Sequence, residues 1–331
     1  MTPLTEILRD LIRREGPIEF RRFMELALYH PEHGYYRRGR DPFGRGGDYY
    51  TAEQLQPVFG ILAARLVRGL EQRLGCPPGF TVVELGAGRR EMAEAFSGWR
   101  YVPVEVGEAP PEGLTGVVFA NEFFDALPVD EAVRRGGQWR LMRVDWRAER
   151  FVWVEGEAAT GAAAEFLERF VPLEEEGCRA EVHLEALRRL EEIGRILSRG
   201  FLLAIDYGYT RREALRLREG TLMSYRRHRA TEEVLEEPGE RDITAHVPFS
   251  ALMEHGARCG LQTVRLERLG RVLLEAGEQD GFAAALGSGA ERLRRGLQLK
   301  SLLFGLGESF RVLLQHKEAG GNEKGPEAIG A

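Results

Sequence analysis

The sequence predicts an α/β protein with a doubly wound, mostly parallel sheet. Three short apolar runs support this prediction, at 80–85, 101–105 and 116–120, and each is followed by a glycine or polar turn. Strands that are apolar throughout belong to sheets buried on both faces, and such sheets are built with helical crossovers. A helical N-terminal extension and an inserted antiparallel β segment complete the expected architecture.

The helical extension is expected over 1–75. Apolar residues recur with helical spacing in 4–14 and 18–28, and a Gly-Pro pair separates the two predicted helices. A Gly/Arg loop at 37–48 follows, and 52–74 has the pattern of a third helix.

The core is expected over 76–317. A short helix is predicted at 89–97, between the first two strands. Gly136-Gly137 separates two runs of alternating polarity, which predicts an antiparallel hairpin or meander inserted at 130–155.

The C-terminal half returns to the α/β pattern. We expect a long helix at 179–199, then a buried strand at 201–205, and an Arg/Glu-rich insertion on the substrate side at 211–247. The later elements are expected to be helices at 248–259 and 290–304 and strands at 261–266 and 310–314, followed by a disordered tail at 318–331.

The composition excludes some classes of function. The chain has 331 residues, 46 basic against 52 acidic side chains and a net charge of −6, so it has no overall cationic field for nucleic acid. No apolar run is long enough to span a bilayer, and the N-terminus lacks the pattern of a secretory signal. Three scattered cysteines favour a reducing, cytoplasmic location, and no metal site is predicted.

A glycine turn follows the first predicted strand. Glu84 precedes Gly86 and Gly88, and Glu105 lies 17 residues after Gly88, where it ends the next strand. Such a turn lets a ligand approach the backbone, and an acidic residue at the second strand end can accept from ribose hydroxyls. Arg90 replaces the third glycine of a dinucleotide motif, which favours S-adenosylmethionine (SAM) over NAD. A simple strand–helix turn is the alternative interpretation.

The run Asn-Glu-Phe-Phe-Asp-Ala-Leu-Pro at 121–128 follows the third strand. Carboxylates and an amide beside two phenylalanines are costly to bury without a role. They suit a cleft that accepts a cation, such as the sulfonium of SAM or a cationic methyl acceptor. The alternative is a helix N-cap at Asn121 with Asp125 on a solvated face.

These residues resemble a known family, the MidA-like SAM-dependent methyltransferases, relatives of the mitochondrial complex I assembly arginine methyltransferase. The run at 121–128 is characteristic of that family. Further similar blocks lie at 17–36, 47–60, 206–209, 220–228, 242–250 and 307–313.

The resemblance implies a class I SAM-methyltransferase (Rossmann-like) fold with SAM as cofactor. It implies that SAM is bound by Gly47, Thr51, Glu84, Gly86, Gly88, Glu105 and Asn121. It implies catalytic roles for Glu122, Asp125 and Asp206. The implied acceptor is a protein arginine, in a subunit of a complex I-like NADH dehydrogenase, and a homo-oligomer is compatible with the sequence.

Three departures from the family support a second hypothesis, a catalytically impaired assembly or binding factor. Gln54 replaces an expected carboxylate, and Arg90 replaces a glycine. The segment 106–116 is too short, and too rich in Gly and Pro, for the helix and strand that the family places around the adenine. An NAD-dependent oxidoreductase is a third hypothesis, disfavoured by the missing glycine and by the run at 121–128.

Overall fold

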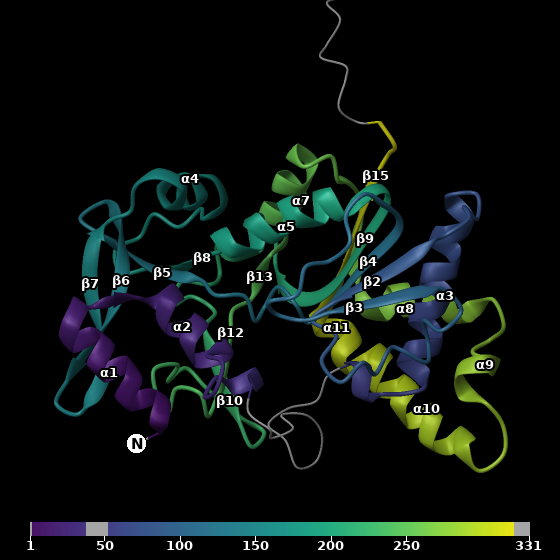
Figure 1. Cartoon of the computed structure of the whole chain (residues 1–331), viewed down its shortest axis with the longest axis horizontal. Coiled ribbons are helices and arrows are strands. Elements are labelled where there is room, and N and C mark those ends of the chain that lie inside the picture. The colour runs from purple at the N-terminus through teal and green to yellow at the C-terminus, as the bar shows by residue number, and fades with distance from the viewer. Residues whose placement is uncertain (1, 38–51, 321–331) are drawn as a thin grey trace, which may run out of the picture. The chain divides into compact units, whose positions relative to one another are not determined.

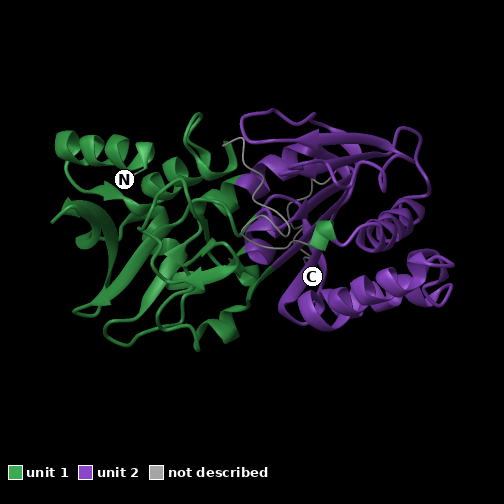
Figure 2. Ribbon diagram, turned by 90° about the horizontal axis from the view of Figure 1, so that it is seen from below, with its two compact units in different colours: residues 1–54, 124–188, 207–251 green, residues 55–123, 189–206, 252–331 purple. Residues whose placement is uncertain are grey.

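A computed structural model of the chain describes residues 2–37 and 52–320. The chain forms two compact units, coloured separately in Figure 2. Unit 1 comprises 1–54, 124–188 and 207–251, and unit 2 comprises 55–123, 189–206 and 252–331. The chain therefore passes from one unit to the other within the run 121–128 and again directly after Asp206.

The main sheet has the strand order β14-β15-β9-β4-β2-β3. β2, β4 and β9 pair in parallel, as do β2 and β3, whereas β14 and β15 are antiparallel. The predicted parallel sheet is thereby confirmed. Its strands are β2 (Thr81–Leu85), β3 (Arg100–Val104), β4 (Leu114–Asn121), β9 (Leu197–Tyr209), β14 (Gln262–Arg268) and β15 (Phe310–Lys317).

Helices cover both faces of this sheet, as a doubly wound fold requires. Figure 1 shows α5 (Leu184–Ile196) and α7 (Phe249–Arg258) on one face, and α3 (Val58–Arg73) and α8 (Leu269–Glu278) on the other. After α8 come α9 (Ala283–Leu286), α10 (Glu291–Ser301), the π-helical turn η3 (Leu302–Leu306) and α11 (Gly307–Ser309).

Unit 1 has its own antiparallel sheet, in the order β1-β6-β5-β8, with β7 paired to β6. This sheet includes the predicted insertion at 130–155. Its strands are β1 (Ile18–Glu19), β5 (Asp130–Arg135), β6 (Gln138–Arg147), β7 (Arg150–Ala158) and β8 (Arg179–Val182). α1 (Pro3–Glu15) and α2 (Phe20–Tyr29) pack their apolar faces into a core that includes Val144 of β6.

The remaining elements of unit 1 are short. A three-stranded antiparallel sheet has the order β11-β10-β12, and β13 pairs in parallel with the end of β9 at Gly208 and Tyr209. These elements are η1 (Tyr35–Arg37), η2 (Ala52–Gln54), α4 (Gly161–Phe170), α6 (Arg211–Ala214), β10 (Met223–Arg226), β11 (Arg229–Thr231), β12 (Asp242–Thr244) and β13 (Val247–Pro248).

Two predicted helices are wrong. Residues 89–97 form turns, because Gly88 and Arg90 have φ values of 51° and 60°, in the left-handed region that a helix excludes. The long helix at 179–199 is instead β8, α5 and the start of β9, because 179–182 pairs with β5. Strand pairing overrides the local helical pattern there.

The segment between β3 and β4 contains neither helix nor strand, as its Gly and Pro content predicts. Residues 38–48 of the loop predicted at 37–48, and residues 321–331 of the tail predicted at 318–331, lie outside the described residues.

Candidate functional site

The glycine turn lies where β2 ends, at the carboxyl edge of the parallel strands. Gly86 has a φ of 68°, and its N–H donates to the carbonyl of Val104 at 2.9 Å. The Gly88 N–H donates to the Glu105 carboxylate, so the structure brings these two predicted residues together. A Cβ atom at Gly86 would lie 3.2 Å from the Phe123 ring, which leaves little space for any larger residue.

Glu84, by contrast, lies within the sheet. Its side chain is buried and accepts a hydrogen bond from the Tyr101 hydroxyl. The Tyr101 ring packs against Phe96, which in turn contacts Phe119 of β4. The predicted role of Glu84, binding SAM, stays a prediction.

Asn121 and Glu122 lie at the end of β4. Glu122 has a φ of 50°, and its N–H donates to the carbonyl of Ile205 at 2.9 Å. The Asn121 amide nitrogen donates to Glu122 Oε1 at 3.3 Å. The Asn121 amide oxygen is buried and has no hydrogen-bond partner among the described residues. No helix begins here, so the N-cap alternative is wrong.

Asp206 occupies the matching position on the neighbouring strand. Asn121 pairs with Ile205 across β4 and β9, and Asp206 follows directly. Its side chain has no exposed surface. Asn121 and Glu122 therefore lie at the carboxyl end of β4, beside Asp206 of β9, on the side of the sheet where parallel α/β folds bind ligands.

Asp125 belongs to unit 1 and lies in a network of hydroxyl groups. Burial raises the pKa of Asp125 to about 6, and a hydrogen bond from Tyr207 opposes that rise. The Tyr207 hydroxyl also lies 2.8 Å from the Thr244 Oγ1 atom. Tyr225 forms hydrogen bonds with Tyr207 and Thr244, and its pKa is raised by burial and then by the nearby charge of Asp125 and Asp242.

A second buried carboxylate, Asp242, lies close to this network. The Tyr36 hydroxyl donates to Asp242 at 2.9 Å, and the Tyr36 ring stacks on Tyr29 with 5.5 Å between centroids. The Tyr29 hydroxyl donates to the carbonyl of Ala126 at 2.8 Å. Sequence reasoning assigned no role to these tyrosines. The available signal was that Tyr36, Tyr207 and Tyr225 all lie in the family-like blocks.

The sequence also gave no sign of a buried acidic pair in unit 1. Glu131 and Glu181 are directly opposite each other on β5 and β8, and both are about 1% exposed. Burial, and then the charge of Glu181, raises the pKa of Glu131 to about 8, although Arg179 donates to Glu131 at 2.6 Å. Burial also raises the pKa of Glu181.

This pair predicts a pH-dependent stability. Between about pH 4.5 and 8 the unfolded Glu131 is ionised while the folded Glu131 retains its proton, so the free energy of unfolding falls as pH rises. Glu131→Gln should flatten this fall and stabilise the protein by about 1–3 kcal/mol at the upper end. Urea denaturation across this range measures the effect. Glu157→Gln, at an exposed position of β7, is the control, and equal slopes in all three proteins would contradict the prediction.

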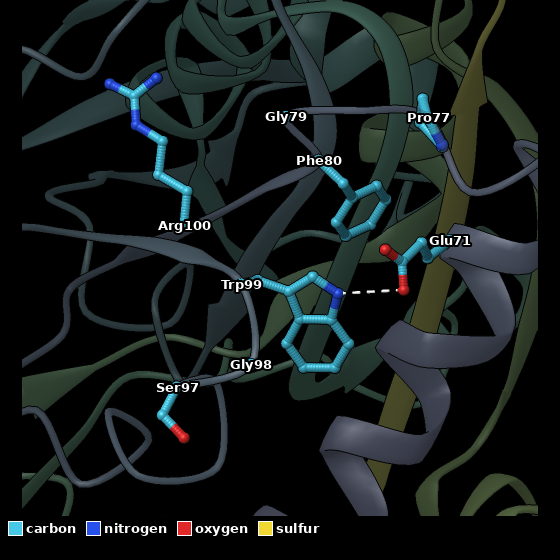
Figure 3. Close-up of a pocket in the computed structure, with 8 residues that line it drawn as sticks. All are labelled: Glu71, Pro77, Gly79, Phe80, Ser97, Gly98, Trp99 and Arg100. Carbon is cyan, nitrogen blue, oxygen red and sulfur yellow. Dashed lines mark hydrogen bonds between the residues drawn. The ribbon is translucent and has the colours of Figure 1, made fainter.

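A shallow pocket of about 340 Å³ lies at the opposite edge of the main sheet. Figure 3 shows its lining, including Trp99, whose indole N–H donates to Glu71 at 3.1 Å. Residues 77–80 precede β2, residues 97–99 precede β3, and Arg100 begins β3, so the pocket lies at the amino ends of the strands. It is therefore separate from the predicted cofactor site.

The described residues contain no cluster of three or more acidic, histidine or cysteine side chains arranged to hold a metal. Within the same residues, no helix is both long and apolar enough to cross a membrane.

A parallel α/β sheet with a glycine turn after β2 and an acidic residue after β3 defines the Rossmann-like class of cofactor-binding folds. The chain belongs to the family described as "Putative S-adenosyl-L-methionine-dependent methyltransferase", whose model matches residues 98–266, about half of the chain. The protein is thus a SAM-dependent methyltransferase, and SAM is its cofactor.

Solved structures agree with this assignment. A COG1565 superfamily member from Burkholderia thailandensis, bound to S-adenosyl-homocysteine, is 30% identical with a TM-score of 0.86. That similarity covers 96% of this chain and 92% of the other. A second structure of a COG1565 superfamily protein from the same organism is 29% identical, with a TM-score of 0.79 and the same coverage.

Curated relatives are more distant. The Drosophila melanogaster protein arginine methyltransferase NDUFAF7 homolog, mitochondrial, is 26% identical over 94% of this chain and 84% of its own length. The Homo sapiens protein arginine methyltransferase NDUFAF7, mitochondrial, is 26% identical over 76% of this chain and 68% of its own length.

The described residues suit the cofactor. The left-handed turn at Gly86 and Gly88 leaves the backbone open to a ligand, Glu105 can accept from ribose hydroxyls, and the buried Asn121 oxygen offers an acceptor. Gly47 and Thr51, also predicted to bind SAM, lie outside the described residues.

Proposed function

We propose that the protein methylates an arginine side chain of a protein substrate, and that this substrate is a subunit of a complex I-like NADH dehydrogenase. The curated relatives described above are named protein arginine methyltransferases, which supports arginine as the methyl acceptor. The structural observation that carries the proposal is the buried pair of carboxylates, Asp125 and Asp242, among tyrosine hydroxyls and rings. Carboxylates and aromatic faces are the groups that bind a guanidinium.

The chemistry of an arginine acceptor determines what the protein side chains must do. SAM supplies a methyl group that is already activated by its sulfonium. A guanidinium stays protonated in water, so carboxylates must orient it and remove a proton as the new C–N bond forms. We assign these tasks to Glu122 and Asp125 first, and rank Asp206 after them as a candidate for the same role. Asn121 orients the cofactor or the acceptor.

Asp125 is suited to accept a proton. A carboxyl with a pKa of about 6 is mostly ionised at neutral pH, yet it binds a proton more readily than an ordinary aspartate. The Tyr207 hydrogen bond stabilises its ionised form.

Tyr207→Phe should therefore raise the pKa of Asp125 above its wild-type value of about 6. The acidic limb of kcat/KM for methyl transfer should move to higher pH by about one to two units, because the loss of one hydrogen bond to a charged group costs about 1.5–3 kcal/mol. A pH profile with a radiolabelled methyl donor measures the shift. Tyr29→Phe, which removes the hydrogen bond to the carbonyl of Ala126, should leave the limb in place. An unmoved limb in Tyr207→Phe would contradict the role of Tyr207.

Mass spectrometry of methylated proteins in a deletion strain and in the wild type tests the function. An arginine methyl mark that is lost on deletion and restored by the wild-type gene, but not by Glu122→Gln, is expected. Calorimetric titration of the purified protein with SAM separates the alternatives. No heat of SAM binding and no thermal shift, or binding of SAM without any lost methyl mark, would favour the assembly-factor hypothesis over arginine methylation.

We also propose a cytoplasmic location with no nucleic-acid partner. The three cysteines without a disulfide and the net charge of −6 support this. The curated relatives named above are mitochondrial proteins. That the protein forms a homo-oligomer stays a hypothesis, which analytical ultracentrifugation can test.

A further inference from the structure

The helical segment 291–306, formed by α10 and η3, has two apolar faces. Its inner face is buried through Leu299, Leu302 and Leu303. Gln298 also faces inward and donates to the carbonyl of Gln56 at 2.8 Å. One apolar face is enough to attach an amphipathic helix to a protein core.

The second apolar face is exposed. Leu293, Leu297 and Phe304 are 77%, 62% and 69% exposed, the highest values among the exposed large hydrophobic residues of the described chain. Steps of four and seven residues place these three side chains on one side of a helix, with Lys300 between them. We call this set the outer stripe. Figure 1 shows α10 along the outside of its unit, beyond α3 and α8.

The charge of the segment is opposite to that of the whole chain. Residues 291–306 contain four cationic side chains and one acidic side chain, within a protein of net charge −6. The single acid, Glu291, is already bonded to Arg295 and lies 3.7 Å from Arg294. Positive charge near the outer stripe is therefore not balanced within the segment.

We propose that the outer stripe docks the protein, lying flat, on an anionic lipid surface. A helix with Leu and Phe on one side and Arg and Lys beside them is the pattern of an interfacial helix. The negative surface of a membrane attracts nearby basic residues, and this attraction acts within a Debye length, so the distant acidic residues of the chain oppose it weakly.

Two other occupants fit less well. A second copy of the chain, related by a two-fold axis, would place the stripe against itself, and Lys300 would then face its own counterpart. A protein partner would need a groove matched to three protruding side chains, whereas a lipid interface admits Leu and Phe without one.

Vesicle flotation of the full chain tests the proposal independently of methyl transfer. The protein should float with vesicles of phosphatidylcholine and phosphatidylglycerol at low salt, and not with phosphatidylcholine alone. Phe304→Ser should weaken this binding more than about tenfold, because it removes a buried aromatic ring from the lipid. Lys300→Gln should weaken it about fivefold, as expected for one charge.

Leu215→Ser is the matched control, because Leu215 is 50% exposed in unit 1 and should not affect flotation. Unchanged thermal unfolding checks that each variant folds. The proposal is overturned if the wild type does not bind anionic vesicles, or if Phe304→Ser binds them as tightly as the wild type does. A lipid-free dimer that Phe304→Ser dissociates would assign the stripe to a second copy. Binding to polyglutamate, with no binding to vesicles, would assign it to an acidic protein.

Discussion

Glu122→Gln is expected to lower kcat for methyl transfer by about a hundredfold to ten-thousandfold, the range that a positioned proton acceptor supplies. Gln keeps the shape of the side chain but cannot take a proton or hold a guanidinium by charge. The Glu122 backbone is held by a hydrogen bond to Ile205, which the substitution leaves in place. Affinity for SAM should change little, since a glutamine Oε1 atom can still accept the hydrogen bond from Asn121, the neighbouring residue assigned to SAM.

Single-turnover assays with a peptide acceptor measure this loss, and calorimetry measures SAM binding. Glu278→Gln is the matched control, because Glu278 is exposed near the end of α8. Turnover in Glu122→Gln equal to that of Glu278→Gln would contradict the catalytic role of Glu122. A parallel loss of SAM affinity would instead place Glu122 among the cofactor residues.

Glu105→Ala is expected to weaken SAM binding by about tenfold to a hundredfold. The Glu105 carboxylate accepts the Gly88 N–H, so it holds the glycine turn, and it is also the acceptor proposed for the ribose hydroxyls. Hydrogen bonds to a charged group contribute about 1.5–3 kcal/mol each, which corresponds to this loss of affinity.

Isothermal titration of SAM into the purified protein gives the dissociation constant. Glu112→Ala is the control, because Glu112 lies in the same loop before β4 and is exposed. If both variants bind SAM as tightly as the wild type does, the Glu105 side chain contributes to SAM affinity neither by holding the glycine turn nor by binding the ribose. Weakened binding with kcat retained at saturating SAM would confirm a role in cofactor affinity alone.

Much of the predicted cofactor site can be inferred from short stretches of sequence. The apolar run at 80–85 forms a buried strand, and only glycine takes the left-handed turn at Gly86 without strain. Because parallel strands end at one edge of the sheet, Glu105 after β3 lies near Gly88 after β2, and its carboxylate accepts the Gly88 N–H.

The local sequence pattern gave a wrong prediction where strand pairing determined the structure. The stretch 179–199 has helical periodicity, yet 179–182 pairs with β5 as a strand. The same pairing places Glu181 opposite Glu131, an arrangement that neither strand reveals alone.

The sequence by itself determined the class of fold, the glycine turn and the acidic residues at strand ends, because each depends on the backbone preferences of a few adjacent residues. Only the tertiary structure decided that Tyr207 reaches Asp125 and that Leu293 and Phe304 stay outside the core. These facts depend on segments far apart in the chain. Which face of a helix is buried, and which hydroxyl meets which carboxylate, is decided by how those segments pack together and by the conformational entropy that their contacts must overcome.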